Sequence, residues 1–291
     1  MATAKLTHRR HKRPKRYVRC SIGLFLGRRI YNSTVIVGIV LDDLFHPLGT
    51  GTLFRTKSRV ICITAAHVVR QARQSEGPIG IVCRDSRLLL IHPGDDSDSS
   101  AAIRLAPEPA DAALIQLPSG ISGSISMNPI LDWPMDEEET SPAEVVYCLL
   151  GYSVNTLKGP WSRYSMPQTM PPSHFTATQY EGVTQGLAGY HPHFHLLFGF
   201  GWHTSAERGP EVSGTEDFLG GTSLLVDFPS GMAGMSGCTV WKLKPVNAGQ
   251  PGRVKEPQGI VALQTGLYAS TRIIKATRWA VVSSLLQPEA A

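Results

Sequence analysis

Three residues able to perform acyl transfer together occur in this chain in the order His67, Asp111 and Ser236. A serine hydroxyl becomes a nucleophile when a neighbouring base removes its proton, and histidine suits that task because imidazole ordinarily titrates near neutral pH. A carboxylate fixes the imidazole tautomer and stabilises its positive charge. The three residues therefore predict a hydrolytic triad. Their structural alternatives are a core histidine, an acid at the end of a loop and a serine in a turn.

The serine lies in a glycine-rich stretch, between Gly234 and Gly237. Glycine adopts backbone conformations that a side chain forbids, so such a segment can direct several N–H groups at one point. That arrangement stabilises the oxyanion formed during acyl transfer. Glycine and serine also build ordinary turns, which is the alternative for this motif taken alone.

Predicted strands and a helix position the histidine and the acid. His67 follows the apolar run 60–63 and precedes residues 68–72, which we interpret as a short helix. Asp111 comes immediately before a short apolar strand that ends at residue 117. The rival acids belong to a polar loop with no strand directly after it, so Asp111 is the preferred partner of the histidine. These rivals are Asp95, Asp96 and Asp98.

The local motifs resemble those of the trypsin-like (chymotrypsin-fold) serine peptidases, in particular bacterial members of intracellular type. Residues 49–53 (GTGTL) are similar to the family's G-[ST]-G-x-[LFV] turn, and residues 64–67 match T-A-A-H in full. Residues 111–114 match D-x-A-[LIV], and residues 234–237 match G-x-S-G. Met235 stands where many members carry an acid in G-D-S-G-G-P, so the activation mechanism that uses this acid is not carried over.

The resemblance implies a role for each matched residue. It makes His67 the general base, Asp111 the orienting acid and Ser236 the nucleophile. The backbone N–H groups of Gly234 and Ser236 are expected to form the oxyanion hole. We therefore expect a serine endopeptidase that acts on polypeptide substrates and needs no cofactor or metal. The alternative is a catalytically silent fold that serves as a binding or sensing module.

The resemblance also implies a substrate pocket. Its base is expected at Ser230, six residues before the nucleophile, and its wall at Ala262, Leu263 and Gln264, whose backbone is expected to pair with an extended substrate. Because Ser230 is small and uncharged, we expect no strong preference for arginine or lysine.

Many short apolar strands separated by Gly, Asp and Ser are typical of a β-barrel or sandwich. With the resemblance, this rhythm predicts an all-β, chymotrypsin-like double antiparallel β-barrel of six strands each, with a C-terminal α-helix near residues 274–286. We expect four segments: 1–20, a basic tail; 21–125, the first barrel; 126–142, a linker; and 143–291, the second barrel with the helix.

Charge is unevenly distributed along the 291 residues. The net charge is +5, yet residues 1–19 carry eight of the 28 Lys and Arg and no acid, leaving 20 basic against 23 acidic residues elsewhere. The segment is interpreted as a solvated leader. The alternative is an arm that contacts the phosphates of a nucleic acid or another anionic partner.

The sequence favours a cytoplasmic protein. The apolar run 22–26 is too short for a secretory signal, and no run is long enough to span a bilayer. Five scattered cysteines without C-x-x-C spacing favour free thiols. His191, His193 and His195 suggest a metal site, with the last two on one face of a strand, but a surface or pocket-lining role is preferred because no Cys or Asp nearby completes a ligand set.

Overall fold

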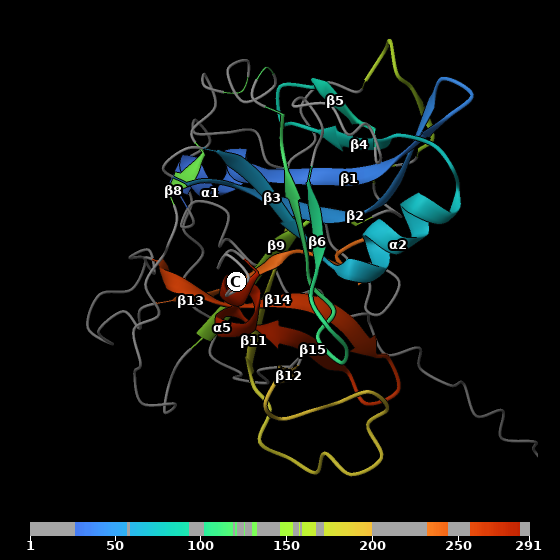
Figure 1. The fold of residues 1–291 in the computed structure, drawn as a ribbon. Coiled ribbons are helices and arrows are strands. Elements are labelled where there is room, and N and C mark those ends of the chain that lie inside the picture. The colour runs from blue at the N-terminus through green and yellow to red at the C-terminus, as the bar shows by residue number, and fades with distance from the viewer. Residues whose placement is uncertain are drawn as a thin grey trace, which may run out of the picture.

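The computed structural model describes residues 27–56, 59–92, 102–118, 120, 125, 130–132, 146–153, 157, 159–166, 172–199, 232–243 and 257–285. These residues build two β units that lie one above the other in Figure 1, with short helices at their margins. The predicted all-β class is therefore confirmed.

The first unit is a nine-stranded sheet. Seven strands follow the order β5-β4-β1-β2-β3-β7-β6, and the short strands β8 and β10 each pair with β2. Helix α1 (Gly27–Ser33) precedes the sheet, and α2 (Ala66–Gln74) follows its third strand. The strands are β1 (Thr34–Leu41), β2 (Leu44–Arg55), β3 (Val60–Thr64), β4 (Ile79–Val82), β5 (Leu88–Ile91), β6 (Ile103–Leu105), β7 (Ala113–Gln116), β8 (Leu131–Asp132) and β10 (Trp161–Ser162).

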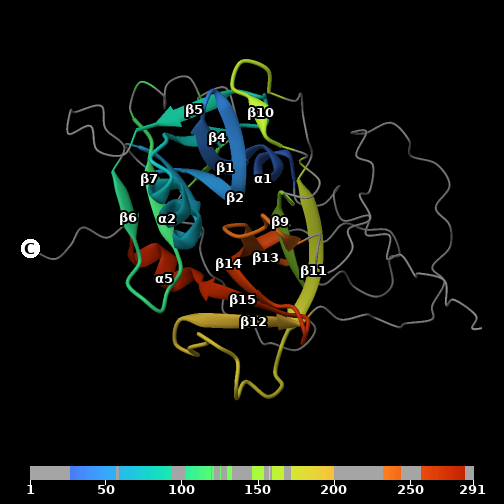
Figure 2. The same cartoon turned by 90° about the vertical axis from the view of Figure 1, so that its right-hand side faces the viewer.

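The second unit is a closed antiparallel barrel in the order β11-β12-β15-β14-β13-β9. A short helix, α5 (Trp279–Ser284), follows the last strand. The barrel strands are β9 (Val146–Gly151), β11 (Ser173–Gln179), β12 (His195–Gly199), β13 (Thr239–Leu243), β14 (Pro257–Tyr268) and β15 (Ile273–Arg278). The same barrel fills the lower half of Figure 2.

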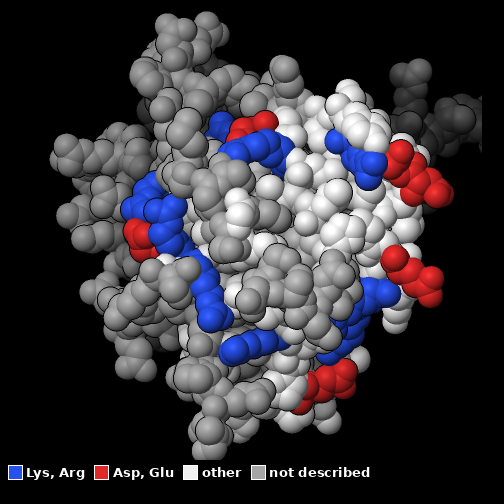
Figure 3. All heavy atoms as spheres, turned by 45° about the horizontal axis from the view of Figure 1, so that its top comes forward, with Lys and Arg blue, Asp and Glu red and all other residues white. Residues whose placement is uncertain are grey.

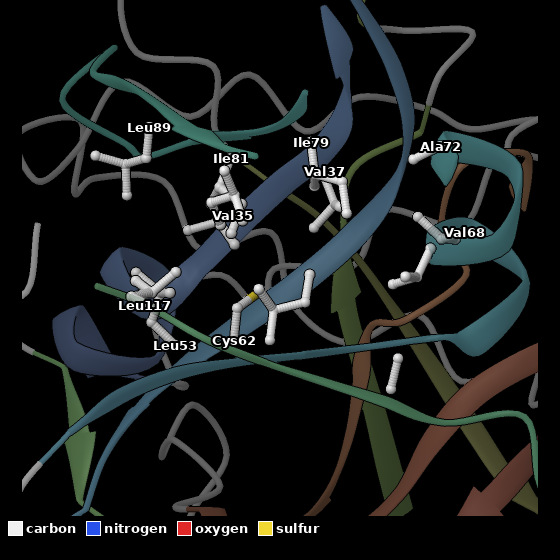
Figure 4. Packing of buried hydrophobic residues seen from close by; sticks show 14 of the residues in the cluster. Val35, Val37, Leu53, Cys62, Val68, Ala72, Ile79, Ile81, Leu89 and Leu117 are labelled. Carbon is white, nitrogen blue, oxygen red and sulfur yellow. The ribbon is translucent and has the colours of Figure 1, made fainter. Parts of the chain in front are cut away.

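Strand β1 carries no polar side chain after Thr34 because both of its faces are covered. Val35, Val37 and Ile39 point into the core of the first unit, whereas Ile36 and Val40 pack on the opposite side. Alternate residues of a strand face opposite sides, so an unbroken apolar run requires apolar partners on both. Figure 4 shows the inner cluster, in which strand residues meet side chains from α2.

A separate apolar cluster joins the two units. It contains Ile61 and Ile63 of β3, Leu263 of β14 and Trp279 of α5, all at most 2% exposed. Phe54 of β2 packs against the Trp279 ring with centroids 5.5 Å apart. The two units are thus held together by a continuous hydrophobic interface.

The predicted C-terminal helix is present as α5, and three details of the architecture differ from the prediction. Only the second unit closes into a six-stranded barrel within the described residues, and the first forms a nine-stranded sheet instead. Residues 161–162, expected in the second barrel, pair with β2 of the first unit. The C-terminal helix is shorter than predicted because residues 273–278 pair with β12 and β14 as a strand. The predicted tail (1–20) and most of the predicted linker lie outside the described residues.

Candidate active site

His67 is the second residue of α2, at the point where the chain leaves β3. Thr64, Ala65 and Ala66, which lead into it, are all fully buried. They hold the start of the helix against the core, while the His67 side chain remains 42% exposed. The backbone that carries the imidazole is therefore packed against the core, and the ring itself is accessible from solvent.

Strand pairing brings Asp111 to His67. β7 runs antiparallel to β3 with Ala113 opposite Thr64, so the residues before β7 lie beside those after β3. The Asp111 Oδ1 atom accepts the backbone N–H of His67 at 2.8 Å, and Oδ2 lies 2.5 Å from the His67 Nδ1 atom. An ionised carboxylate can only accept, so Nδ1 carries the hydrogen and Nε2 faces away from the acid.

The Asp111 carboxyl is largely buried, with 17% of its side chain exposed. Burial acts to raise its pKa, but the His67 hydrogen bonds and the positive charges of His67 and Arg70 outweigh burial and leave the pKa below its usual value. The acid is thus ionised at neutral pH and can hold a protonated imidazole.

Arg70 is a residue of this site that the sequence analysis missed. Its Nη1 atom lies 4.0 Å from Asp111 Oδ1, and its Nη2 atom lies 3.8 Å from Glu108 Oε1. The signal was present in the sequence, because residue 70 is three positions after His67 in a predicted helix and so shares its face.

Ser236 lies in a turn anchored to the first unit. Its carbonyl oxygen accepts the backbone N–H of Thr50 at 2.8 Å, and the Thr50 hydroxyl donates to the Gly234 carbonyl at 3.0 Å. The next residue, Gly237, has a φ of +91° and donates its N–H to the Gln264 carbonyl at 2.8 Å. The turn is thus held between β2 of the first unit and β14 of the second.

Contacts at Gly237 bring this turn to the start of α2. A Cβ at position 237 would lie 2.4 Å from Thr64 Oγ1 and 2.9 Å from the Ala65 nitrogen, just before His67 in the chain. In Figures 1 and 2 the orange segment before β13 likewise lies beside the beginning of α2. Ser236 and His67 therefore come from different units to one place. Within the described residues no hydrogen bond joins their side chains.

The backbone N–H groups of the serine turn alternate in their bonding. Those of Met235 and Gly237 donate to the carbonyls of Met232 and Gln264. Those of Gly234 and Ser236 donate to no acceptor among the described residues. The two groups predicted for the oxyanion hole are thus the ones not used by the turn itself.

The predicted pocket wall is placed differently from the expectation. Ala262 and Leu263 are fully buried in hydrophobic clusters, and their backbone is paired with β13 on one edge and β15 on the other. Gln264 is 2% exposed, and both its N–H and its carbonyl are bonded to the serine turn. The backbone of this segment is therefore already hydrogen-bonded within the protein, and its role as the pocket wall stays a prediction. Ser230 lies outside the described residues.

The continuation of β14 offers a different edge. β13 begins at Thr239, opposite Leu263, whereas β14 extends to Tyr268. Among the described residues, the segment 265–268 therefore has a strand partner only on its β15 side. The sequence predicts the strand, but it does not reveal which edges are occupied.

The histidine segment does not form the predicted strand face. His195 begins β12 and is fully buried, whereas His193 is exposed in the preceding turn. The His195 Nδ1 atom accepts the backbone N–H of His191 at 3.0 Å, and burial, with the charge of Lys275 nearby, lowers the pKa of His195 to about 4. No group of three metal-binding side chains occurs in the part of the chain that is described.

On the face in Figure 3, the described Lys and Arg side chains lie mostly next to Asp or Glu, so charges of both signs alternate there. None of the described helices has both the length and the apolar character needed to cross a bilayer. The basic segment 1–19 lies outside the described residues, so the interpretation as a solvated leader and the alternative of an anion-binding arm both stay predictions.

Comparisons with known proteins give structural matches only. No protein-family model matches the sequence, and no curated protein matches it significantly. The serine protease domain of the Sesbania mosaic virus polyprotein aligns at 13% identity and a TM-score of 0.45, covering 89% of this chain and 94% of that one. A Glu endopeptidase aligns at 13% identity and a TM-score of 0.44, covering 89% and 92%. Tobacco etch virus protease aligns at 14% identity and a TM-score of 0.43, covering 86% and 74%. At these values the similarity concerns only the arrangement of strands, and no residue role is taken from it.

Proposed function

We propose that this protein is a serine endopeptidase. The observation that supports the proposal most directly is the two-point contact of Asp111 with the backbone and ring of His67, beside the turn that carries Ser236. A structural histidine needs neither an acid that fixes its tautomer nor a serine turn beside it. A general base needs both.

In the proposed reaction, His67 Nε2 takes the proton of the Ser236 hydroxyl as its oxygen attacks a peptide carbonyl. Asp111 holds the imidazole and stabilises the imidazolium that forms. The N–H groups of Gly234 and Ser236 bind the oxyanion. His67 then donates its proton to the leaving amine, and water hydrolyses the acyl-enzyme by the reverse use of the same groups.

The substrate backbone is proposed to pair with residues 265–267 of β14. This edge begins directly after Gln264, whose carbonyl is bonded to Gly237 beside the nucleophile. An extended peptide added to a strand edge gains main-chain hydrogen bonds whatever its sequence. Substitution of Gly266 by proline, which adds bulk and removes an N–H, is expected to raise KM.

The experiment is labelling with a serine-directed fluorophosphonate together with turnover of a mixed peptide library. The wild type should label and cleave, Ser236→Ala should do neither, and His67→Ala should label at least about a hundredfold more slowly. Ser284→Ala on α5 is the matched control and should behave as the wild type. A folded wild-type protein that neither labels nor cleaves any peptide would overturn the proposal.

A further inference from the structure

Arg70 stands one helical turn after His67 and reaches the same acid. Its guanidinium lies 4.0 Å from Asp111 Oδ1 and 3.8 Å from Glu108 Oε1, so α2 bridges two acids of the loop between β6 and β7. The Arg70 side chain is 38% exposed. The contact is therefore a partly solvated charge pair.

The two oxygens of Asp111 face different groups. Oδ2 lies against the imidazole, whereas Oδ1 accepts the His67 backbone N–H and faces Arg70. When the imidazole becomes protonated, one carboxylate is shared by two cations. A guanidinium keeps its charge at every relevant pH, so this competition is permanent.

We propose that Arg70 is a positioning residue for the reaction: it holds Asp111 in place and competes with the protonated His67 ring for the charge of the same carboxylate. The inference rests on the proposed function. Arg70 weakens the field of Asp111 at the imidazole and repels the imidazolium directly. Both effects favour the neutral, base-competent ring.

The surrounding charges are consistent with this assignment. Glu108 faces Arg70 from the loop and is 84% exposed, so it restrains the guanidinium without neutralising it. From the second unit, His195 lies near the backbone of Pro109 and is uncharged above about pH 4. The described part of the serine turn, residues 232–238, carries no charged side chain. Arg70 is thus the one permanent cation of the described residues paired with the acid.

The test compares Arg70→Gln with two controls. Arg70→Lys keeps the charge, and Arg73→Gln removes the same charge from the exposed end of α2. Two readouts are used: the pH profile of kcat/KM, and the titration of the His67 ring followed by NMR in a Ser236→Ala background, which requires no turnover.

With Arg70→Gln, the acidic limb of the profile and the ring titration should both move up by roughly 0.5 pH unit at 0.05 M salt. The shift should shrink at 1 M salt, where the Debye length falls to about 3 Å. Arg70→Lys should retain most of the wild-type position, and Arg73→Gln should move it by less than about a third as much.

An unchanged limb in Arg70→Gln, or an equal shift in Arg73→Gln, would overturn the inference while leaving the proposed function intact. A shifted ring titration in a protein that cleaves no peptide would instead reject the proposed function and support only the electrostatic coupling.

Discussion

Replacing Gly237 by alanine tests how firmly the serine turn is pressed against the first unit. The added Cβ would lie 2.1 Å from the Thr50 carbonyl oxygen, 2.4 Å from Thr64 Oγ1 and 2.9 Å from the Ala65 nitrogen. Two of these atoms belong to the backbone and cannot rotate away as the end of a side chain can. The φ of +91° adds strain, because residues with a Cβ rarely adopt it.

A second glycine separates the two costs. Gly186 has a similar φ of +85°, but a Cβ there would meet nothing within 4 Å. Gly186→Ala should therefore lower the free energy of unfolding only by the cost of placing an alanine at this positive φ, about 1–2 kcal/mol. Gly237→Ala should add an overpacking cost of about 1–3 kcal/mol, which lowers the free energy of unfolding by about 2–5 kcal/mol in total. For a chain of this size that corresponds to a fall in Tm of roughly 10 °C, against about 4 °C for the control.

The assay is urea unfolding followed by tryptophan fluorescence, with thermal unfolding by circular dichroism as a second probe. Both variants should keep the wild-type m-value, so that the midpoints report stability. If Gly237→Ala were no less stable than Gly186→Ala, the turn would not be held as described. The close approach of Gly237 to β2 and to the start of α2 would then not explain the glycine after Ser236.

Three further outcomes are expected. The folded-state pKa of His195 is about 4, below the unfolded value of roughly 6.5, so the unfolded state binds more protons between these two pH values. The free energy of unfolding should therefore fall as pH drops from about 6.5 to about 4. His195→Gln should flatten this pH dependence in urea unfolding, and an unchanged slope contradicts the assignment. The pKa of Asp111 is lowered in the folded protein, so the ionised carboxylate stabilises the fold above the unfolded pKa, and this stabilisation is lost as pH falls below about 4. Asp111→Asn should therefore lose less stability below about pH 4 in urea unfolding, and its kcat/KM should fall by about 10⁴. Burial raises the pKa of the Cys62 thiol, and it raises that of the Cys83 thiol to about 12. Both thiols should therefore react with a thiol reagent only as the protein unfolds, and rapid labelling of Cys62 or Cys83 in the native protein would count against this.

Much of the strand pattern could be predicted from the sequence because it is decided locally. Residues 79–82 and 88–91 are apolar runs bounded by turn-forming residues, and β4 and β5 occupy these bounds. The helix after His67 was also predicted, and α2 covers it. In these segments the local pattern and the burial in the fold agree, so no distant contact is needed to decide them.

Pairing between distant segments could not be predicted in the same way. β10 is only two residues long, and Trp161 is placed opposite Phe45 by a stack of the two rings, with centroids 5.8 Å apart. No periodicity can be read from two residues. The predicted C-terminal helix is present as α5, but it begins only at Trp279, because residues 273–278 pair with strands on both sides as β15.

In the candidate site, too, the features set by local motifs could be predicted, and those set by pairing between distant segments could not. The pairing of His67 with Asp111 followed from local motifs and from strand order. The strand partners of residues 262–264 could not be predicted, because a strand in the sequence does not show which of its edges other strands already use. Arg70 was missed although helical spacing places it beside His67, because an arginine on a helix is ordinarily a solvated residue.

The return of the chain through β10 has a consequence for dividing this protein. Tyr152, Leu157 and Trp161 come after the first barrel strand, β9, yet they pack on the outer face of the first sheet. A fragment that ends before β9 would leave the edge of β2 near Phe45 without a strand partner. The complementary fragment would expose the apolar side chains of Tyr152, Leu157 and Trp161. The two units thus share one packed interface formed by segments from both, and we expect them to fold and unfold in a single cooperative transition.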